Sequence, residues 1–238
     1  MLSWELSNPT SSLASNHLAR IRLRARIEQS VSLSCQPLQL GGKVFDWHRV
    51  VNPEVLLNKA ASNAGQPAEE VDPFWAATWR AAIGLDRFLQ QLNLNGVDIL
   101  ELGCGSGQAG VGAAAQNAQV TMTDAVGIAL LVARLNAWPV IDRVQFRRLR
   151  WTIDKLHGPP FSVIIGSDLV YDTKLFSLLE TCARAHLAVG GRLYLSEPHR
   201  HTGDIFSGWI RTAGWQVVEH DINLQDDRVP IRIFECWR

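Results

Sequence analysis

The sequence predicts an α/β fold, in which seven strands form a mainly parallel sheet between helices and only the last strand is reversed. From about residue 79 onward, short strand-like runs alternate with segments whose apolar residues recur at helical spacing. Such alternation forms right-handed βαβ units, whose strands are parallel. The last two predicted strands are separated only by Asn223–Val229. This segment does not fit a crossover helix, so we expect an antiparallel hairpin there.

The part of the chain before this alternation is expected to be an extension rich in β-structure. Gly41-Gly42 lies between two runs of strand-like composition, which is typical of a β-hairpin, and Asn52-Pro53 starts a short helix. We therefore expect an N-terminal extension over residues 1–70 and a second domain over residues 71–238. The predicted elements of the extension are a helical or extended segment from Leu18, strands Val31–Leu40 and Val44–His48, a helix Glu54–Ala61 and an exposed loop Ser62–Glu70.

The second domain is predicted to be a Rossmann-like sheet flanked by helices. Its first helix has apolar residues at helical spacing, among them Ile83, Phe88 and Leu92. The predicted elements are, in order, helix Trp79–Leu92, strand Val97–Leu102, helix Gln108–Asn117, strand Gln119–Thr123, helix Gly127–Ala137, strand Val144–Trp151, strand Phe161–Ser167, helix Lys174–Ala188, strand Gly191–Ser196, helix Gly203–Ala213, and strands Trp215–Ile222 and Pro230–Trp237.

The composition indicates a globular protein without a strong charge bias. Apolar residues make up 47% and charged residues 19% of the 238 residues, which excludes a disordered chain. Lys+Arg and Asp+Glu are both 23, so no overall basic field exists to hold a phosphate backbone. A long nucleic acid is therefore not the expected substrate.

The cysteines and the N-terminus indicate a cytoplasmic protein without a metal site. The four cysteines are scattered and form no Cys-x-x-Cys pair, which argues against zinc or a disulfide framework. The first fifteen residues contain no Lys or Arg and no apolar core, so they do not form a signal peptide. The longest uncharged apolar run, Val126–Ala133, is too short to span a bilayer.

Four arginines occupy every second position near the N-terminus, at Arg20, Arg22, Arg24 and Arg26. If this segment is extended, all four charges lie on one face. Such a face fits a solvated edge strand whose charges discourage self-pairing, or else a docking face for an acidic partner.

A glycine-rich loop, Glu101-Leu-Gly-Cys-Gly-Ser-Gly107, follows the first strand of the second domain directly. Ligands of parallel sheets bind at the carboxyl ends of the strands. Glycine lets the backbone pass close to a ligand, and the next helix offers free N–H groups to an anion. Gly103, Cys104, Gly105 and Gly107 are therefore candidate cofactor-binding residues.

Two classes of nucleotide cofactor compete for this loop. The glycines from Gly105 to Gly110 also match G-x-G-x-x-G, the dinucleotide fingerprint of nicotinamide dehydrogenases. That match begins two residues too late, however, and Glu101 would place a negative charge beside a pyrophosphate. The same carboxylate suits the ammonium group of S-adenosylmethionine. Together with the reversed last strand, this favours a methyltransferase over a dehydrogenase.

Two further residues are candidates for the nucleoside part of the cofactor. Asp124 ends the second strand, where a carboxylate can accept hydrogen bonds from both ribose hydroxyls, although it could instead be the N-cap of the next helix. Trp151 closes the predicted third strand, where an adenine ring would lie, and simple packing explains it equally well.

The fourth strand ends in polar residues that could meet the reacting groups. Ser167 is a candidate cofactor contact at its end, and Asp168 and Tyr171 follow it. Methyl transfer is an in-line displacement, so Asp168 could orient an amine and balance its developing charge, while Tyr171 walls the pocket. The alternatives are a turn residue for Asp168 and packing for Tyr171. Leu169-Val170 between them argues against the Pro-Pro of enzymes that methylate amides or flipped bases.

At these motifs the chain resembles methyltransferase family 16, which includes seven-β-strand protein-lysine methyltransferases acting on chaperones and on the electron-transfer flavoprotein β-subunit. The resemblance implies that Trp75 and Trp79 lie near the cofactor and that Asp168 and Tyr171 border the acceptor nitrogen. Arg80 departs from relatives that have Pro or Asp there. The motifs that carry the resemblance are Asp72–Arg80, Glu101–Gly107, Asp124, Leu149–Trp151 and Asp168–Tyr171, within residues 70–200.

The sequence thus predicts a methyltransferase that uses S-adenosylmethionine, releases S-adenosylhomocysteine and methylates an amine, most simply a protein lysine. A small-molecule N-methyltransferase is the first alternative, since the fold serves both kinds of acceptor. A cofactor-binding module without catalysis and an NAD-dependent dehydrogenase are the others.

Overall fold

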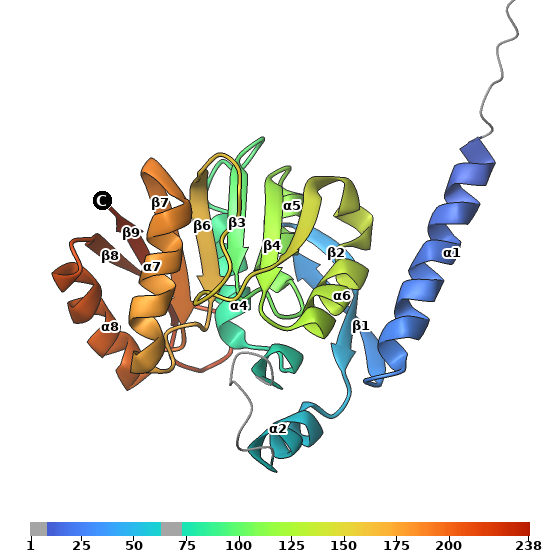
Figure 1. The fold of residues 1–238 in the computed structure, drawn as a ribbon, viewed down its shortest axis with the longest axis horizontal. Helices are drawn as coiled ribbons and strands as arrows, with labels where there is room; N and C mark the ends of the chain where they lie inside the picture. The colour runs from blue at the N-terminus through green and yellow to red at the C-terminus, as the bar shows by residue number, and fades with distance from the viewer. Residues whose placement is uncertain (1–8, 63–72) are drawn as a thin grey trace, which may run out of the picture.

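The protein is described here from a computed structural model, which describes residues 9–62 and 73–238. Within these ranges the central sheet has seven strands in the order β5-β4-β3-β6-β7-β9-β8 (Figure 1). The strands are β3 (Asp98–Leu102), β4 (Gln119–Asp124), β5 (Val144–Arg148), β6 (Phe161–Ser167), β7 (Leu187–Glu197), β8 (Gln216–Ile222) and β9 (Ile231–Trp237).

The reversed last strand is confirmed. β3, β4, β5, β6 and β7 pair in parallel, whereas β9 inserts between β7 and β8 and is antiparallel to both. The third strand is shorter than predicted. β5 ends at Arg148, and Trp151 lies in the turn that follows, so it does not close the strand.

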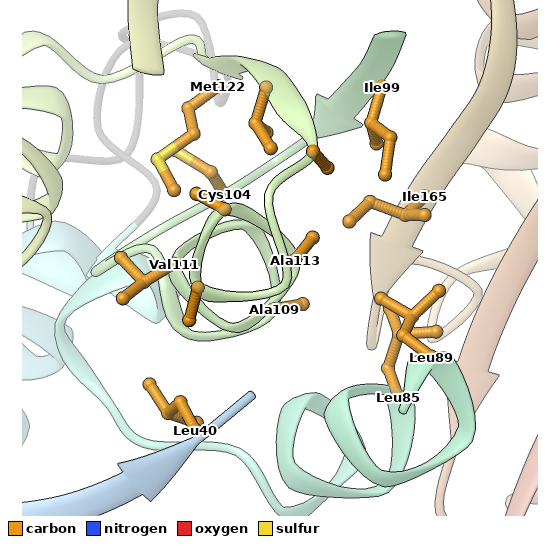
Figure 2. Packing of buried hydrophobic residues seen from close by; sticks show 14 of the residues in the cluster. Leu40, Leu85, Leu89, Ile99, Cys104, Ala109, Val111, Ala113, Met122 and Ile165 are labelled. Atoms are coloured by element: carbon orange, nitrogen blue, oxygen red, sulfur yellow. The ribbon is translucent and has the colours of Figure 1, made fainter. Parts of the chain in front are cut away.

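Helices cover both faces of the sheet, as the βαβ pattern predicts. Because side chains alternate along a strand, Ile99 of β3 enters one hydrophobic cluster with α4 and α5, and its neighbour Leu100 enters another with α7 and α8. Figure 2 shows the first cluster, in which Leu85 of α4 and Ala113 of α5 lie near Ile165 of β6. The helices are α4 (Arg80–Leu89), α5 (Gln108–Ala115), α6 (Gly127–Asn136), α7 (Phe176–His186) and α8 (His201–Thr212).

The predicted hairpin is confirmed as β1 (Leu33–Leu40) and β2 (Lys43–Val50), which pair antiparallel around Gly41-Gly42. It is part of the core of the protein, because Leu40, Phe45 and Trp47 are buried in the same cluster as residues of α4 and α5. The predicted short helix is α2 (Pro53–Ser62), and the predicted loop over 63–70 lies outside the described residues.

The arginine-rich segment is a helix, α1 (Pro9–Glu28), so its interpretation as an edge strand is wrong. Arginines two positions apart lie on opposite sides of a helix, and the four charges do not share one face. Ile27 is fully buried against Val132 and Leu135 of α6, and this contact attaches α1 to the body (Figure 1). No helix in the described ranges has the length and apolar character needed to cross a membrane.

The tip of the hairpin is locked between two helices. The Gly41 N–H donates to Oδ1 of Asp86 in α4 at 2.9 Å, and Asp86 is 2% exposed. Gly41 has a φ of 54°, and a Cβ on it would lie 2.2 Å from the Gly112 carbonyl oxygen of α5. Burial raises the pKa of Asp86 to about 6. The turn, α4 and α5 therefore approach too closely for any side chain at Gly41 or Gly112.

We expect G112A to destabilise the protein by about 2 kcal/mol. Its methyl group would lie 1.9 Å from Asp86 Oδ1 and would push α4 and α5 apart. The control is G208A, in α8, where an added Cβ meets nothing within 4 Å. That change should be neutral or stabilise by up to about 1 kcal/mol. Chemical denaturation of both variants measures the change in the free energy of unfolding. Equal changes in the two variants would contradict the close contact between Gly112 and Asp86.

Candidate active site

The glycine-rich loop joins β3 to α5 and takes the backbone conformations for which glycine is needed. Gly103, Gly105 and Gly107 have φ angles of 57°, 51° and 92°, in the left-handed region. The Cys104 N–H donates to the Thr123 carbonyl oxygen at 2.8 Å, so the loop is attached to the end of the neighbouring strand. The loop thus turns its backbone over the carboxyl ends of β3 and β4.

Asp124, the last residue of β4, also holds this loop. Its Oδ2 accepts from the Gly105 N–H at 2.9 Å, and its Oδ1 accepts from the Val126 N–H at 2.8 Å. Val126, and not Asp124, is the N-cap of α6, so the interpretation of Asp124 as a helix cap is wrong. Its buried carboxylate lies directly against the loop, where it can also meet a ligand.

Glu101 lies under the loop as a buried carboxylate. It is 1% exposed, and its Oε2 has no hydrogen-bond partner among the described residues. Burial raises the pKa of Glu101 to about 8, a backbone hydrogen bond from Gly110 opposes that rise, and the Asp124 charge adds to it. An ammonium group would supply the missing charge and hydrogen bond. The site therefore fits a ligand that bears an amine, and Glu101 also anchors the first turn of α5.

Asn136 is a supporting residue that the sequence did not reveal. This side chain at the end of α6 is 1% exposed. Its Nδ2 donates to the carbonyl oxygens of Ser106 and His48 at 3.1 and 3.0 Å, and its Oδ1 accepts from the His48 N–H at 2.8 Å. One amide thus joins the glycine loop to the N-terminal hairpin. The available signal was an uncharged polar residue at the end of a helix whose other residues are apolar except for Arg134.

Aromatic residues form a second part of the site. Trp79 and Tyr171, which the sequence predicted, both contact Phe74, with ring centroids 6.1 and 5.5 Å apart. Trp79 Nε1 donates to the Phe74 carbonyl oxygen at 2.9 Å. The 3-10 helix η1 (Pro73–Ala76) lies over the loop, since a Cβ on Gly105 would be 3.3 Å from the Trp75 carbonyl oxygen. The predicted Trp segment therefore lies beside the loop.

Asp168 lies at the carboxyl end of β6, beside this aromatic group. It has a φ of 58°, and its N–H donates to the Ser196 carbonyl oxygen at 2.8 Å. Its carboxylate is paired with the guanidinium of Arg200: Nη2 donates to Oδ2 at 3.1 Å, and Nη1 contacts Oδ1. The Arg200 guanidinium lies 5.9 Å from the Trp79 ring centre. Nothing in the sequence marks Arg200, although it follows β7, which ends at the same edge of the sheet.

The remaining predicted residues occupy different surroundings. Ser167 is half-buried at the end of β6, where it is in register with Ser196 of β7. The Cys104 side chain is buried in the core (Figure 2), where its thiol donates to the Gly105 carbonyl oxygen at 3.7 Å and burial raises its pKa well above the ordinary value. Trp151 is half-buried and packs against the cluster on the α7 side of the sheet.

Comparisons of the sequence relate this chain to named lysine methyltransferases. The profile of a family described as lysine methyltransferase matches residues 69–206. EEF1A lysine methyltransferase 3 of Mus musculus is 32% identical over 169 residues, which cover 68% of this chain and 71% of that enzyme. The electron transfer flavoprotein beta subunit lysine methyltransferase of Xenopus laevis is 29% identical over 136 residues, 54% of each chain.

Solved structures confirm the fold. The glycopeptide N-methyltransferase MtfA, in complex with S-adenosyl-L-methionine, superposes with a TM-score of 0.58 at 14% identity, covering 68% of this chain and 96% of that one. Two findings lead to one conclusion: the family profile matches more than half of the chain, and a named lysine methyltransferase is 32% identical to it. The chain belongs to the lysine methyltransferase family, methyltransferase family 16, which its motifs resemble.

Proposed function

We propose that this enzyme transfers a methyl group from S-adenosylmethionine to the side-chain nitrogen of a protein lysine. The observation that carries the proposal is the juxtaposition of a buried carboxylate, Asp168, with aromatic side chains at the edge of the sheet that also holds the glycine loop. A methyl transfer needs little more than alignment of nitrogen, methyl carbon and sulfur in a suitable field.

The donor half of the site has groups for each part of the cofactor. The glycine loop would lie along it, Asp124 would accept hydrogen bonds from the ribose hydroxyls, and Glu101 would hold the ammonium group. Ser167, Trp79 and Trp151 would border it. When bound, S-adenosylmethionine supplies a methyl group on a positively charged sulfur. The complexes that MtfA forms with S-adenosyl-L-methionine and S-adenosyl-L-homocysteine support this choice of cofactor.

The acceptor half fits the chemistry of a lysine. The Phe74, Trp79 and Tyr171 rings offer apolar surface for an aliphatic chain, and Asp168 offers an oxygen to the amine at its end. The relatives named as lysine methyltransferases support a protein acceptor. The cysteines are free thiols, which supports a reducing compartment such as the cytoplasm.

Incubation with a cell extract and tritiated S-adenosylmethionine tests the acceptor. We expect label in a protein band, and mass spectrometry of that band should find methylated lysine. Label confined to the small-molecule fraction would instead show a small-molecule N-methyltransferase.

Calorimetry tests the cofactor. S-adenosylhomocysteine should bind, and tight binding of NADH with no binding of S-adenosylhomocysteine would contradict the proposal.

D168N is expected to lower labelling at least about 100-fold, because it removes a carboxylate oxygen that orients the acceptor amine and leaves the Arg200 charge uncompensated beside that amine. Affinity for S-adenosylhomocysteine should stay within about threefold. The matched control is D98N, at the opposite end of the sheet, where Asp98 begins β3 and is exposed. If D168N labels as fast as D98N does, the catalytic role of Asp168 is wrong.

E101Q tests how the ammonium group is held. The pKa of about 8 means that Glu101 is protonated at pH 7 in the free protein. An ammonium favours the ionised form, so binding of S-adenosylhomocysteine at pH 7 should release about one proton, and affinity should rise from pH 6 to 8. E101Q should bind more weakly and without this proton release. Calorimetry in buffers of different ionisation enthalpy measures both. If the native chain releases no proton when the ligand binds, Glu101 does not hold the ammonium group and only anchors α5.

A further inference from the structure

Arg200 lies against the one carboxylate that the proposed function assigns to the acceptor. Its guanidinium pairs with both oxygens of Asp168, whose side chain is 6% exposed, while that of Arg200 is 35% exposed. The same guanidinium lies 5.9 Å from the ring centre of Trp79. A permanent positive charge thus lies directly beside the carboxylate that would receive the acceptor amine.

The position of Arg200 is set by a buried ion pair beneath it. The backbone N–H of Arg200 donates to Oε2 of Glu197 at 2.6 Å, and its backbone carbonyl oxygen accepts from Nη2 of Arg232 at 3.4 Å. Glu197 is 1% exposed and pairs with Arg232, which is 6% exposed. A buried pair of this kind is rigid, because breaking it leaves an uncompensated charge. Arg200 is therefore held beside Asp168 by its backbone as well as by its side chain.

This charge has a consequence for the acceptor. A lysine amine has an ordinary pKa of about 10.4, so at neutral pH it is almost entirely protonated and has no lone pair for attack. An unpaired carboxylate in the pocket would favour the ammonium form further. A carboxylate already neutralised by Arg200 has little attraction for a second cation, but its oxygens can still accept a hydrogen bond from a neutral amine.

We propose that Arg200 is a positioning residue that keeps the acceptor lysine in its neutral, nucleophilic form by neutralising Asp168 and holding its carboxylate in place. The inference rests on the proposed function. The lysine proton leaves to solvent as the side chain enters the pocket. The nitrogen lone pair then forms the bond to the methyl carbon, the carbon–sulfur bond breaks with its electron pair left on sulfur, and the nitrogen carries the positive charge.

Several other ionisable groups on the elements around this pair have partners of their own. Glu197 and Asp204 share Arg232. Outside that network, His199 pairs with Asp221 at 2.9 Å, and Arg80 pairs with Asp226 at 2.7 Å. Tyr171, on the same loop as Asp168, contacts Phe74. Arg200 is therefore the cation whose removal changes the charge on Asp168 most directly.

The test compares pH profiles of single-turnover methylation, with saturating S-adenosylmethionine and the extract in which the native chain labels a protein band. In R200Q we expect the rising limb of the profile to move up by about one pH unit or more. Labelling at pH 7 should then fall about tenfold and recover by about pH 9.5. R200M should behave in the same way and keeps aliphatic packing on Trp79, whereas R200K should keep the limb of the native chain.

R192Q is the matched control. Arg192 also pairs with a carboxylate, Glu235, and lies 4.8 Å from a tryptophan ring, that of Trp237. Its removal from β7 should leave the profile unchanged. Calorimetry with S-adenosylhomocysteine should give each variant an affinity within about threefold of the native value.

Three results would overturn the inference. Equal loss of labelling by R200Q and R200M at every pH would show a structural role. Faster labelling by these variants at pH 7 would show that Arg200 competes with the acceptor for Asp168. An unshifted profile would show that the charge of Arg200 is without effect. If the native chain labels no protein band at any pH, the proposed function itself fails, and this inference with it.

Discussion

The hydrogen bond from the Gly105 N–H to the Asp124 carboxylate is the contact on which the rest of the site depends. Left-handed glycines have many other conformations available, so the loop needs a partner that selects one. Asp124 supplies it from the end of β4, and Asn136 holds Ser106 from α6. The loop is therefore fixed by residues of the elements that surround the ligand. A ligand that binds the Asp124 oxygens would meet a backbone already in place.

Two buried carboxylates at this edge of the sheet differ in whether a cation lies beside them. Glu101 lacks a cation among the described residues, and burial raises its pKa to about 8. Asp168 already has a cation, Arg200. The first site is thus prepared for a positively charged group, as the ammonium of an amino-acid-bearing cofactor is. The second site, at Asp168, suits an amine that binds in its neutral form. The two environments separate the cofactor amine from the acceptor amine by electrostatics as well as by position.

Much of the fold could be predicted because its signals are local. Apolar periodicity placed the helices and strands, and the short Asn223–Val229 segment indicated the reversed strand. The glycine loop could be recognised because its dihedral angles demand glycine. The arginine pattern misled, since alternate arginines suit a strand, whereas burial of Ile27 against α6 stabilises a helix there. The hairpin was expected as an extension, yet Leu40 and Trp47 are buried in the main core.

The candidate site could be predicted only where a residue type points to its role by itself. Asp168 and Tyr171 follow a buried strand, and that placement marks them. Arg200 lies 32 positions from Asp168 and Asn136 lies 30 positions from Ser106. An arginine or an asparagine at such a distance is typical of any solvated turn or helix end, so only the folded chain reveals the pairing. The chemistry of Asp168 nevertheless depends on that unseen partner, because an oxygen that faces a guanidinium presents a different charge to the acceptor from a free carboxylate. The sequence locates the reacting end of the site, and the tertiary contact decides in which protonation state an amine can use it.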